Sequence, residues 1–127
     1  MYTFSKKERL NSKINIHRLF SQGQSLFSYP FKVYYHLEDE ATEKVAVSIL
    51  FSVGKKQFKL AVDRNRVKRL CREAYRLNKG DLINNFDLKN KRLELAFVYV
   101  GKSIPEYHDL ELRMQKILLL LASVDNK

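Results

Sequence analysis

Residues 61–78 read A-V-D-R-N-R-V-K-R-L-C-R-E-A-Y-R-L-N, and the rest of the chain is organised around this stretch. It predicts one amphipathic helix, with Asp63 as a side-chain N-cap and Gly80 just beyond its end. At about 100° per residue, the apolar residues gather on one side of that helix. We expect this side to pack on the core; its members are Val67, Leu70, Cys71, Ala74 and Leu77.

The opposite side of the helix is basic, with Arg66 and Glu73 at its boundary; it holds Arg64, Asn65, Lys68, Arg69, Arg72, Tyr75 and Arg76. Solvated helices usually mix acidic and basic residues, and like charges four residues apart repel each other. The row therefore favours a surface that faces a polyanion, with a merely solvated charged face as the alternative. We interpret Tyr75 as a ring that covers the aliphatic stems of Arg72 and Arg76.

The charge of the chain favours a nucleic-acid partner over a membrane. There are 24 Lys+Arg against 14 Asp+Glu, giving a net charge of +10, and residues 64–76 contribute half of it. A charge concentrated in this way is typical of nucleic-acid binding. No basic helix has the bulky apolar face of a membrane-surface helix. The apolar runs 95–100 and 117–122 are too short to cross a bilayer. Residues 1–127 are expected to form a single domain.

The cysteine content and the N-terminal charges indicate a cytoplasmic protein. Cys71 is the only cysteine, so it cannot form an internal disulfide, and we expect a buried structural thiol in a reducing compartment. Lys6, Lys7 and Arg9 precede any apolar run, unlike the pattern of a signal peptide.

The N-terminal half predicts helical turns followed by two strands. A capping box at 5–8 and a second helix start at Ser12 lead to the apolar stripe Ile16, Leu19 and Phe20, which Gly23 can end. Phe20 has two interpretations, core packing or stacking on a base, and the pattern alone favours the core.

The two predicted strands are residues 31–37 and 44–53. On the first, Lys32, Tyr34 and His36 share a face suited to water or nucleic acid, opposite Phe31, Val33, Tyr35 and Leu37. The acidic residues 38–43 are interpreted as a hairpin loop that points away from RNA. On the second, the small residues Ala46, Ser48 and Ser52, with Leu50, leave room for a close neighbour.

The C-terminal half predicts a loosely ordered connection at 81–91, a strand at 92–100 and a final helix. Leu82, Ile83 and Phe86 would anchor the connection, and the capping box 103–106 would open the helix. The core stripe of that helix is Tyr107, Leu110, Met114, Ile117, Leu118 and Leu121. The order helix, strand, strand, helix, strand, helix predicts an α+β two-layer sandwich with a strand–helix–strand crossover.

No catalytic or metal-binding constellation is visible in the sequence. His17, His36 and His108 lie far apart, without a second ligand at metal-binding spacing. A protein nuclease usually needs convergent carboxylates or a His pair, and the acidic cluster 38–43 falls in one expected loop. The four glycines are too scattered to form a phosphate-binding loop.

The run Ala61-Val62-x-Arg64-Asn65-Arg66-x-Lys68-Arg69-x-x-Arg72-Glu73 resembles the signature of the bacterial ribonuclease P protein component. The signature is long and mostly polar, and the resemblance extends over most of the chain. It implies a left-handed crossover and contact with RNA through Arg64, Asn65, Arg66, Lys68, Arg69, Arg72, Arg76, Lys55 and Lys56. It also implies a central cleft for the 5′ leader of precursor tRNA, lined or supported by Phe20, Phe31 and Tyr34. Ile16 stands where another aromatic residue is common.

The loop before the basic helix departs from the family pattern of Ser-Lys-Lys followed by a glycine. Gly54 replaces the serine, and Phe58 and Lys59 stand where a glycine is expected, although the lysine pair is kept. The shape of residues 54–60 is therefore left open.

The resemblance implies a subunit of ribonuclease P whose RNA partner carries out catalysis with Mg²⁺, while the protein itself has no catalytic residues and binds no cofactor. The expected partners are ribonuclease P RNA and precursor tRNA, with no protein or membrane partner. A ribosomal-type or general RNA-binding protein would share the basic helix. A protein-only nuclease is disfavoured because the required carboxylates are missing.

Overall fold

The computed structural model describes residues 8–10, 13–38, 46–89 and 91–124. Its helices and strands are α1 (Lys13–Gln22), β1 (Gln24–Ser28), β2 (Phe31–Glu38), β3 (Val47–Val53), α2 (Ala61–Asn78), α3 (Gly80–Leu88), β4 (Arg92–Tyr99) and α4 (Tyr107–Ala122). The helical turn predicted from 5–8 and the helix start at Ser12 fall on residues outside the described ranges, apart from Glu8.

The four strands form one sheet in the order β1-β2-β4-β3. β4 pairs antiparallel with β2 and parallel with β3, so β3, α2, α3 and β4 form the predicted crossover. The hairpin predicted to join the strands 31–37 and 44–53 is wrong, because these strands are β2 and β3 and β4 lies between them. β4 is buried along nearly its whole length, as expected for a strand at the centre of a sheet that is covered on both faces.

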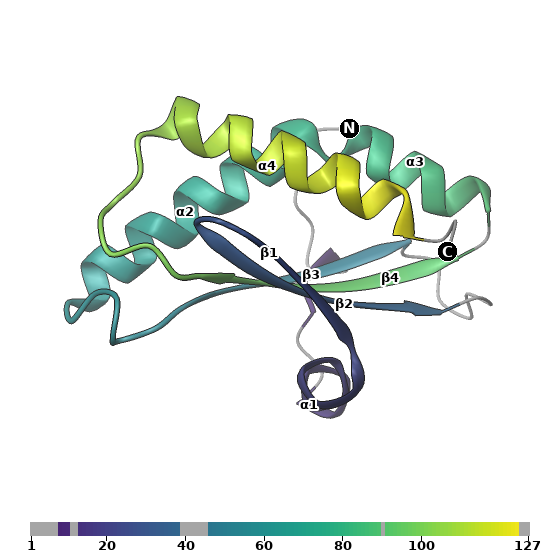
Figure 1. Cartoon of the computed structure of the whole chain (residues 1–127), viewed down its shortest axis with the longest axis horizontal. Helices are drawn as coiled ribbons and strands as arrows, with labels where there is room; N and C mark the ends of the chain where they lie inside the picture. Colours follow the sequence, from purple (N-terminus) through teal and green to yellow (C-terminus); the bar gives the residue numbers. More distant parts are fainter. Residues whose placement is uncertain (1–7, 11–12, 39–45, 90, 125–127) are drawn as a thin grey trace.

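Helices cover the two faces of the sheet unequally, as Figure 1 shows: α2, α3 and α4 lie on one face and α1 lies alone on the other. This confirms the α+β class and the two main layers, with α1 as a partial third. On the α1 side, Leu10 and Leu19 are buried with Ala96, and the Leu10 amide donates to the Ile49 carbonyl at 2.9 Å. A close neighbour therefore packs on the small-residue face of β3, as predicted.

The main core lies between the sheet and the three helices. Every second residue of β2 and β3 enters it, and α4 contributes the predicted stripe of Leu110, Met114, Ile117, Leu118 and Leu121. Burial of each such side chain contributes about 1.5–3 kcal/mol relative to exposure. Within the described residues, no helix has the length and apolar character that crossing a membrane requires.

The structure corrects three predicted helix ends and adds two elements. Leu60 occupies the N-cap position of α2 without a side-chain bond, so the cap assigned to Asp63 is wrong. The predicted capping box 103–106 is wrong as well: Glu106, not Ser103, occupies the N-cap position of α4, and its carboxylate accepts from the amides of His108 and Asp109. Gly80 begins α3 rather than ending the helical run, because Leu82 and Phe86 are buried in the core and hold this segment as a helix.

β1, which the sequence analysis missed, follows directly from the end of α1 and pairs with β2. Gly23 ends α1 as predicted, its amide donating to the Leu19 carbonyl at 3.0 Å. A Cβ at this position would collide with that carbonyl oxygen. The tight approach therefore requires glycine, and it turns the chain at once into β1.

Candidate nucleic-acid interface

Helix α2 presents a row of cations to solvent, which we call the basic face: Arg66, Lys68, Arg69 and Arg72, with Asn65 beside them. All are exposed except Lys68, which is half-buried. The opposite side of the helix is in the core through Val67, Cys71 and Ala74. Leu70 is half-buried and Leu77 is 38% exposed, so the predicted apolar side is narrower than expected.

Two of the predicted RNA contacts are engaged within the protein. Nη1 of Arg64 donates to the carbonyl oxygens of Phe58 and Lys59, both at 2.9 Å. Arg76 donates from Nε and Nη2 to the two carboxylate oxygens of Glu73, at 3.1 and 2.5 Å. This hydrogen-bonded pair lowers the pKa of Glu73 and raises that of Arg76. Both ends of the row are thus held within the protein, and at Arg76 the Glu73 carboxylate also offsets the charge. The basic face is the central part of the row.

The bonds from Arg64 fix the loop whose shape the sequence left open. The Gly54 carbonyl accepts from the amides of Gln57 and Phe58, which closes a tight turn. Phe58 is buried, and its ring stacks on Tyr99 with centroids 6.2 Å apart. Lys55 and Lys56 are exposed on this turn, next to the start of α2. The phenylalanine thus anchors the loop, and the two lysines stay available for phosphate.

Tyr75 does not belong to the basic face. Its side chain is fully buried, and its ring lies 6.0 Å from that of Phe51 in β3. The interpretation of Tyr75 as a cover for arginine stems is therefore wrong. On the helix it lies only about 40° from Cys71, close enough to the apolar side for β3 to draw it into the core. Burial raises the pKa of the Tyr75 phenol, and it raises the pKa of the Cys71 thiol to about 12.

A second surface lies across the sheet, on the side of α1; we call it the aromatic face and define it by Phe20, Phe27, Lys32 and Tyr34. Phe20 is 39% exposed and packs edge-on against Tyr34, with ring centroids 4.7 Å apart. Lys32 Nζ lies 5.2 Å from the Tyr34 ring centroid. Phe27, 65% exposed, is directly opposite Lys32 in the β1–β2 ladder. Phe27 was not among the predicted site residues, because the short and mostly exposed β1 carries no clear strand pattern.

Phe31 does not line this surface. It is fully buried on the helix side of the sheet, against Phe97 and Tyr99 at centroid distances of 5.3 and 5.7 Å. Phe31 was expected either to line the cleft or to support it. Because it is buried on the opposite side of the sheet, only the supporting role fits its position. Alternation along β2 separates Phe31 from Tyr34, so the two side chains are on opposite faces.

Charged residues are buried next to the aromatic face. Glu94 in β4 is fully buried and accepts from Arg18 Nη2 at 2.7 Å and from Arg92 Nη1 at 2.8 Å. His36, Glu38 and Glu94 bring one nitrogen or oxygen each within 4.8 Å of the others, an arrangement that the sequence spacing of the histidines did not predict. Because guanidinium groups hold both Glu94 oxygens, this cluster is organised around ion pairs rather than as an open metal site.

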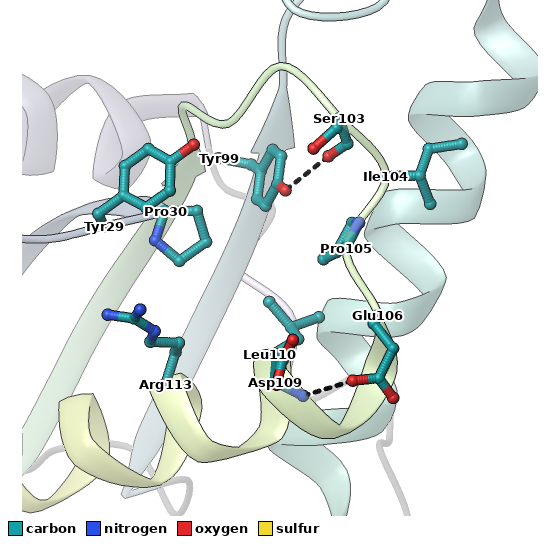
Figure 2. Close-up of a pocket in the computed structure, with 10 residues that line it drawn as sticks. All are labelled: Tyr29, Pro30, Tyr99, Ser103, Ile104, Pro105, Glu106, Asp109, Leu110 and Arg113. Carbon is teal, nitrogen blue, oxygen red and sulfur yellow. Dashed lines mark hydrogen bonds between the residues drawn. The ribbon is translucent and has the colours of Figure 1, made fainter.

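Figure 2 shows a separate cavity of about 260 Å³ between the β1–β2 turn and the start of α4. Tyr29 and Arg113 lie at one side of it, and Glu106 lies at the other. Its polar groups already serve the fold: the Tyr99 hydroxyl donates to the Ser103 carbonyl at 2.8 Å, and Glu106 caps α4. None of the residues predicted to bind RNA lines this cavity.

Comparison with known proteins was made by sequence and by structure. The family described as Ribonuclease P matches residues 4–114. The ribonuclease P protein component of Porphyromonas gingivalis W83 is 42% identical over 122 residues, covering 95% of this chain and 88% of the relative. The ribonuclease P protein component of Chlorobaculum tepidum is 37% identical over 124 residues, covering 91% and 80%.

Solved structures share the fold at lower identity. The ribonuclease P protein of Staphylococcus aureus superposes with a TM-score of 0.69 at 19% identity, covering 89% of this chain and 94% of that one. The ribonuclease P protein from Thermotoga maritima superposes with a TM-score of 0.66 at 22% identity, covering 87% of this chain and 94% of that one.

Proposed function

The chain belongs to the ribonuclease P protein family, and we propose that it binds ribonuclease P RNA and the 5′ leader of precursor tRNA and thereby promotes 5′-end maturation of tRNA. The observation that carries this proposal is the basic face of α2. Arg64 and Arg76 have internal partners, whereas Arg66, Lys68, Arg69 and Arg72 point outward on one helix. Family membership supports ribonuclease P RNA as the polyanion that this face meets.

Docking on RNA follows from the chemistry of these side chains. Each arginine offers a planar fork of donors that matches a phosphate group. Each phosphate neutralised releases counterions, which makes binding fall with salt by about 0.7–0.9 log units per contact. Asn65 can bond a ribose 2′-hydroxyl, a group that only RNA presents. Lys55 and Lys56 extend the positive charge beyond the start of α2.

The aromatic face is suited to a single strand. Exposed rings accept stacked bases of any identity, and a nearby lysine can meet the phosphates between them. Phe20, Tyr34 and Phe27 supply rings, and Lys32 supplies the charge. A leader of variable sequence needs recognition of this tolerant kind.

We place catalysis on the RNA subunit with its Mg²⁺ ions. Metal-assisted cleavage needs carboxylates that converge on open metal positions. In the described part of the chain, the one group of this kind includes Glu94, whose two oxygens are occupied by arginines. The protein then acts on binding, because its excess of positive charge reduces the Mg²⁺ needed to hold two RNAs together.

The test is reconstitution. Purified chain, a bacterial ribonuclease P RNA and labelled precursor tRNA are combined across a magnesium titration, with each component omitted in turn. We expect the chain to restore site-specific cleavage at magnesium levels where the RNA alone is inactive, and to cut nothing by itself. Binding of both RNAs without any gain in cleavage would indicate a general RNA-binding protein. Leader release by the protein alone, surviving nuclease-free purification, would overturn the assignment of catalysis to RNA.

A further inference from the structure

Glu94 forms the centre of a buried ion cluster beneath α1. Its carboxylate is held by Arg18 Nη2 at 2.7 Å and by Arg92 Nη1 at 2.8 Å, and Arg92 Nη2 also donates to Ser48 Oγ at 2.7 Å. The side chains of Glu94 and Arg92 are 0% and 5% exposed. A buried carboxylate that loses one of its partners is strongly destabilised, so the cluster fixes where the Arg18 guanidinium must lie.

The contacts of α1 with the sheet are otherwise sparse. Of the ten residues in this helix, Leu19 alone is fully buried, Ile16 is half-buried, and Ile14 is 80% exposed. Apolar contacts stabilise but do not fix direction, whereas a guanidinium–carboxylate hydrogen bond fixes both distance and angle. Arg18 makes two such bonds, to Glu94 in β4 and, at 3.1 Å, to Glu38 in β2. The helix is thereby tied to two neighbouring strands.

This tie lies one step along the sheet from the ring pair formed by Phe20, which is exposed, and Tyr34, which is half-buried. Glu94 is opposite His36 in the β2–β4 ladder, and the next pair on the same face is Ala96 with Tyr34. On α1, Phe20 is two residues beyond Arg18, and its ring meets Tyr34 at 4.7 Å. The position of α1 over the sheet therefore decides whether these two rings meet.

We propose that Arg18 is a positioning residue for leader binding: held by Glu94 and Glu38, it sets α1 so that Phe20 and Tyr34 together form a base-stacking site. The inference rests on the proposed function and deepens it by naming what builds the site. The alternative is direct contact between Arg18 and a leader phosphate, and the experiment separates the two.

The first measurement compares the affinities of the assembled holoenzyme for precursor tRNA and for mature tRNA. We call the ratio of these two affinities the leader preference. One stacked base contributes 1–3 kcal/mol, which is about 5- to 150-fold. We expect Arg18→Met to reduce the leader preference at least 5-fold, as we also expect of Phe20→Ala, without changing the affinity for mature tRNA or for the RNA subunit. Lys13→Met removes an exposed cation from the same helix and should leave the preference unchanged. An unchanged preference in Arg18→Met, or equal losses for both tRNAs, would overturn the inference.

The second measurement combines the variants. If Arg18 acts through the rings, Arg18→Met adds no further loss in a Phe20→Ala background, because the site is already gone. A full additional loss would mean direct contact with the leader, and would overturn the positioning role. Circular dichroism checks the fold of each variant. If Arg18→Met is not folded, Arg18→Lys replaces it. Lysine keeps the charge and can donate to both carboxylates, but its flexible stem and compact ammonium group do not hold the planar guanidinium geometry. A partial loss of leader preference is therefore expected, and no loss would overturn the inference. A wild-type holoenzyme without leader preference would instead refute the proposed function itself.

Discussion

Cys71 shows how burial sets the chemistry of a single side chain. The thiol is 1% exposed, and burial raises its pKa from about 9 to about 12. A neutral, inaccessible thiol is a packing residue, even on the helix whose other side is the proposed RNA-binding surface.

The raised pKa makes stability depend on pH with a defined sign. Between pH 9 and 12 the thiol ionises in the unfolded chain but stays protonated in the folded one. Its contribution to stability is therefore complete below pH 9 and is lost as pH rises toward 12, at up to about 1.4 kcal/mol per unit. We expect the free energy of unfolding of the wild type to fall faster between pH 8.5 and 10 than that of Cys71→Ala, measured by urea titration. Tyr75 titrates in both proteins and cancels in the comparison. The pKa of Tyr99 is raised first by burial, which both proteins share, and then by the nearby Cys71, so the difference between the curves reports Cys71 together with its effect on Tyr99. Parallel curves would contradict the burial of this thiol.

Tyr34 carries the residue-scale prediction for the aromatic face. Tyr34→Ala should weaken binding of precursor tRNA to the holoenzyme by about 1–3 kcal/mol, the contribution of one stacked base, with little effect on mature tRNA. Tyr29→Ala is the control, because Tyr29 is an exposed tyrosine that lines the cavity of Figure 2 rather than the aromatic face, where Tyr34 is half-buried. Equal losses for both tRNAs would place Tyr34 in the fold or in docking on the RNA subunit.

At the scale of elements, strongly periodic segments were predictable and short or weakly patterned ones were not. The core stripe of α4 follows from burial of every third or fourth residue. The alternation of β2 and β3 follows from burial of every second residue. β1 has five residues, mostly exposed, and so carries little pattern. α3 is polar apart from a few anchors, and its helix depends on the tertiary burial of Leu82 and Phe86.

The positions of the candidate site residues could be predicted from the sequence, but the hydrogen bonds and ion pairs that they make within the protein could not. Sequence spacing placed the exposed cations of α2 correctly, since they follow from helix geometry alone. The hydrogen bonds from Arg64 to two loop carbonyls could not be predicted, because the loop that provides these carbonyls departs from the family pattern. The ion cluster joins α1, β2 and β4, and no local pattern connects elements so far apart in the chain.

The difference between paired and outward cations on α2 is itself testable. Arg72→Gln should reduce the slope of log K against log salt for ribonuclease P RNA by about 0.7–0.9, because one phosphate contact is lost. The double variant Glu73→Gln/Arg76→Gln removes an ion pair at no change in net charge and should leave the slope unchanged. Both are measured by filter binding from 50 to 400 mM salt. Equal slopes in Arg72→Gln and wild type would remove Arg72 from the interface.

At the scale of the whole molecule, the sheet separates two surfaces of different chemistry. The basic face is on α2, among the three helices of one layer, and the aromatic face is on the other side of the sheet with α1 (Figure 1). The main core and the sheet lie between the side chains of the two surfaces. The two surfaces therefore cannot share one partner group, and in the proposed function each meets its own RNA segment.

This separation predicts that the two surfaces act independently. Arg72→Gln should weaken docking on the RNA subunit, and Tyr34→Ala should weaken leader binding in the assembled holoenzyme. In the double variant, each loss should equal that of the single variant within about 0.5 kcal/mol, because substitutions more than about 7–10 Å apart without shared partners are additive. Docking is measured with the RNA subunit alone, and leader binding is measured as precursor against mature tRNA at saturating protein. A coupling above about 1 kcal/mol would mean that one RNA segment crosses both surfaces, and that the sheet does not separate them.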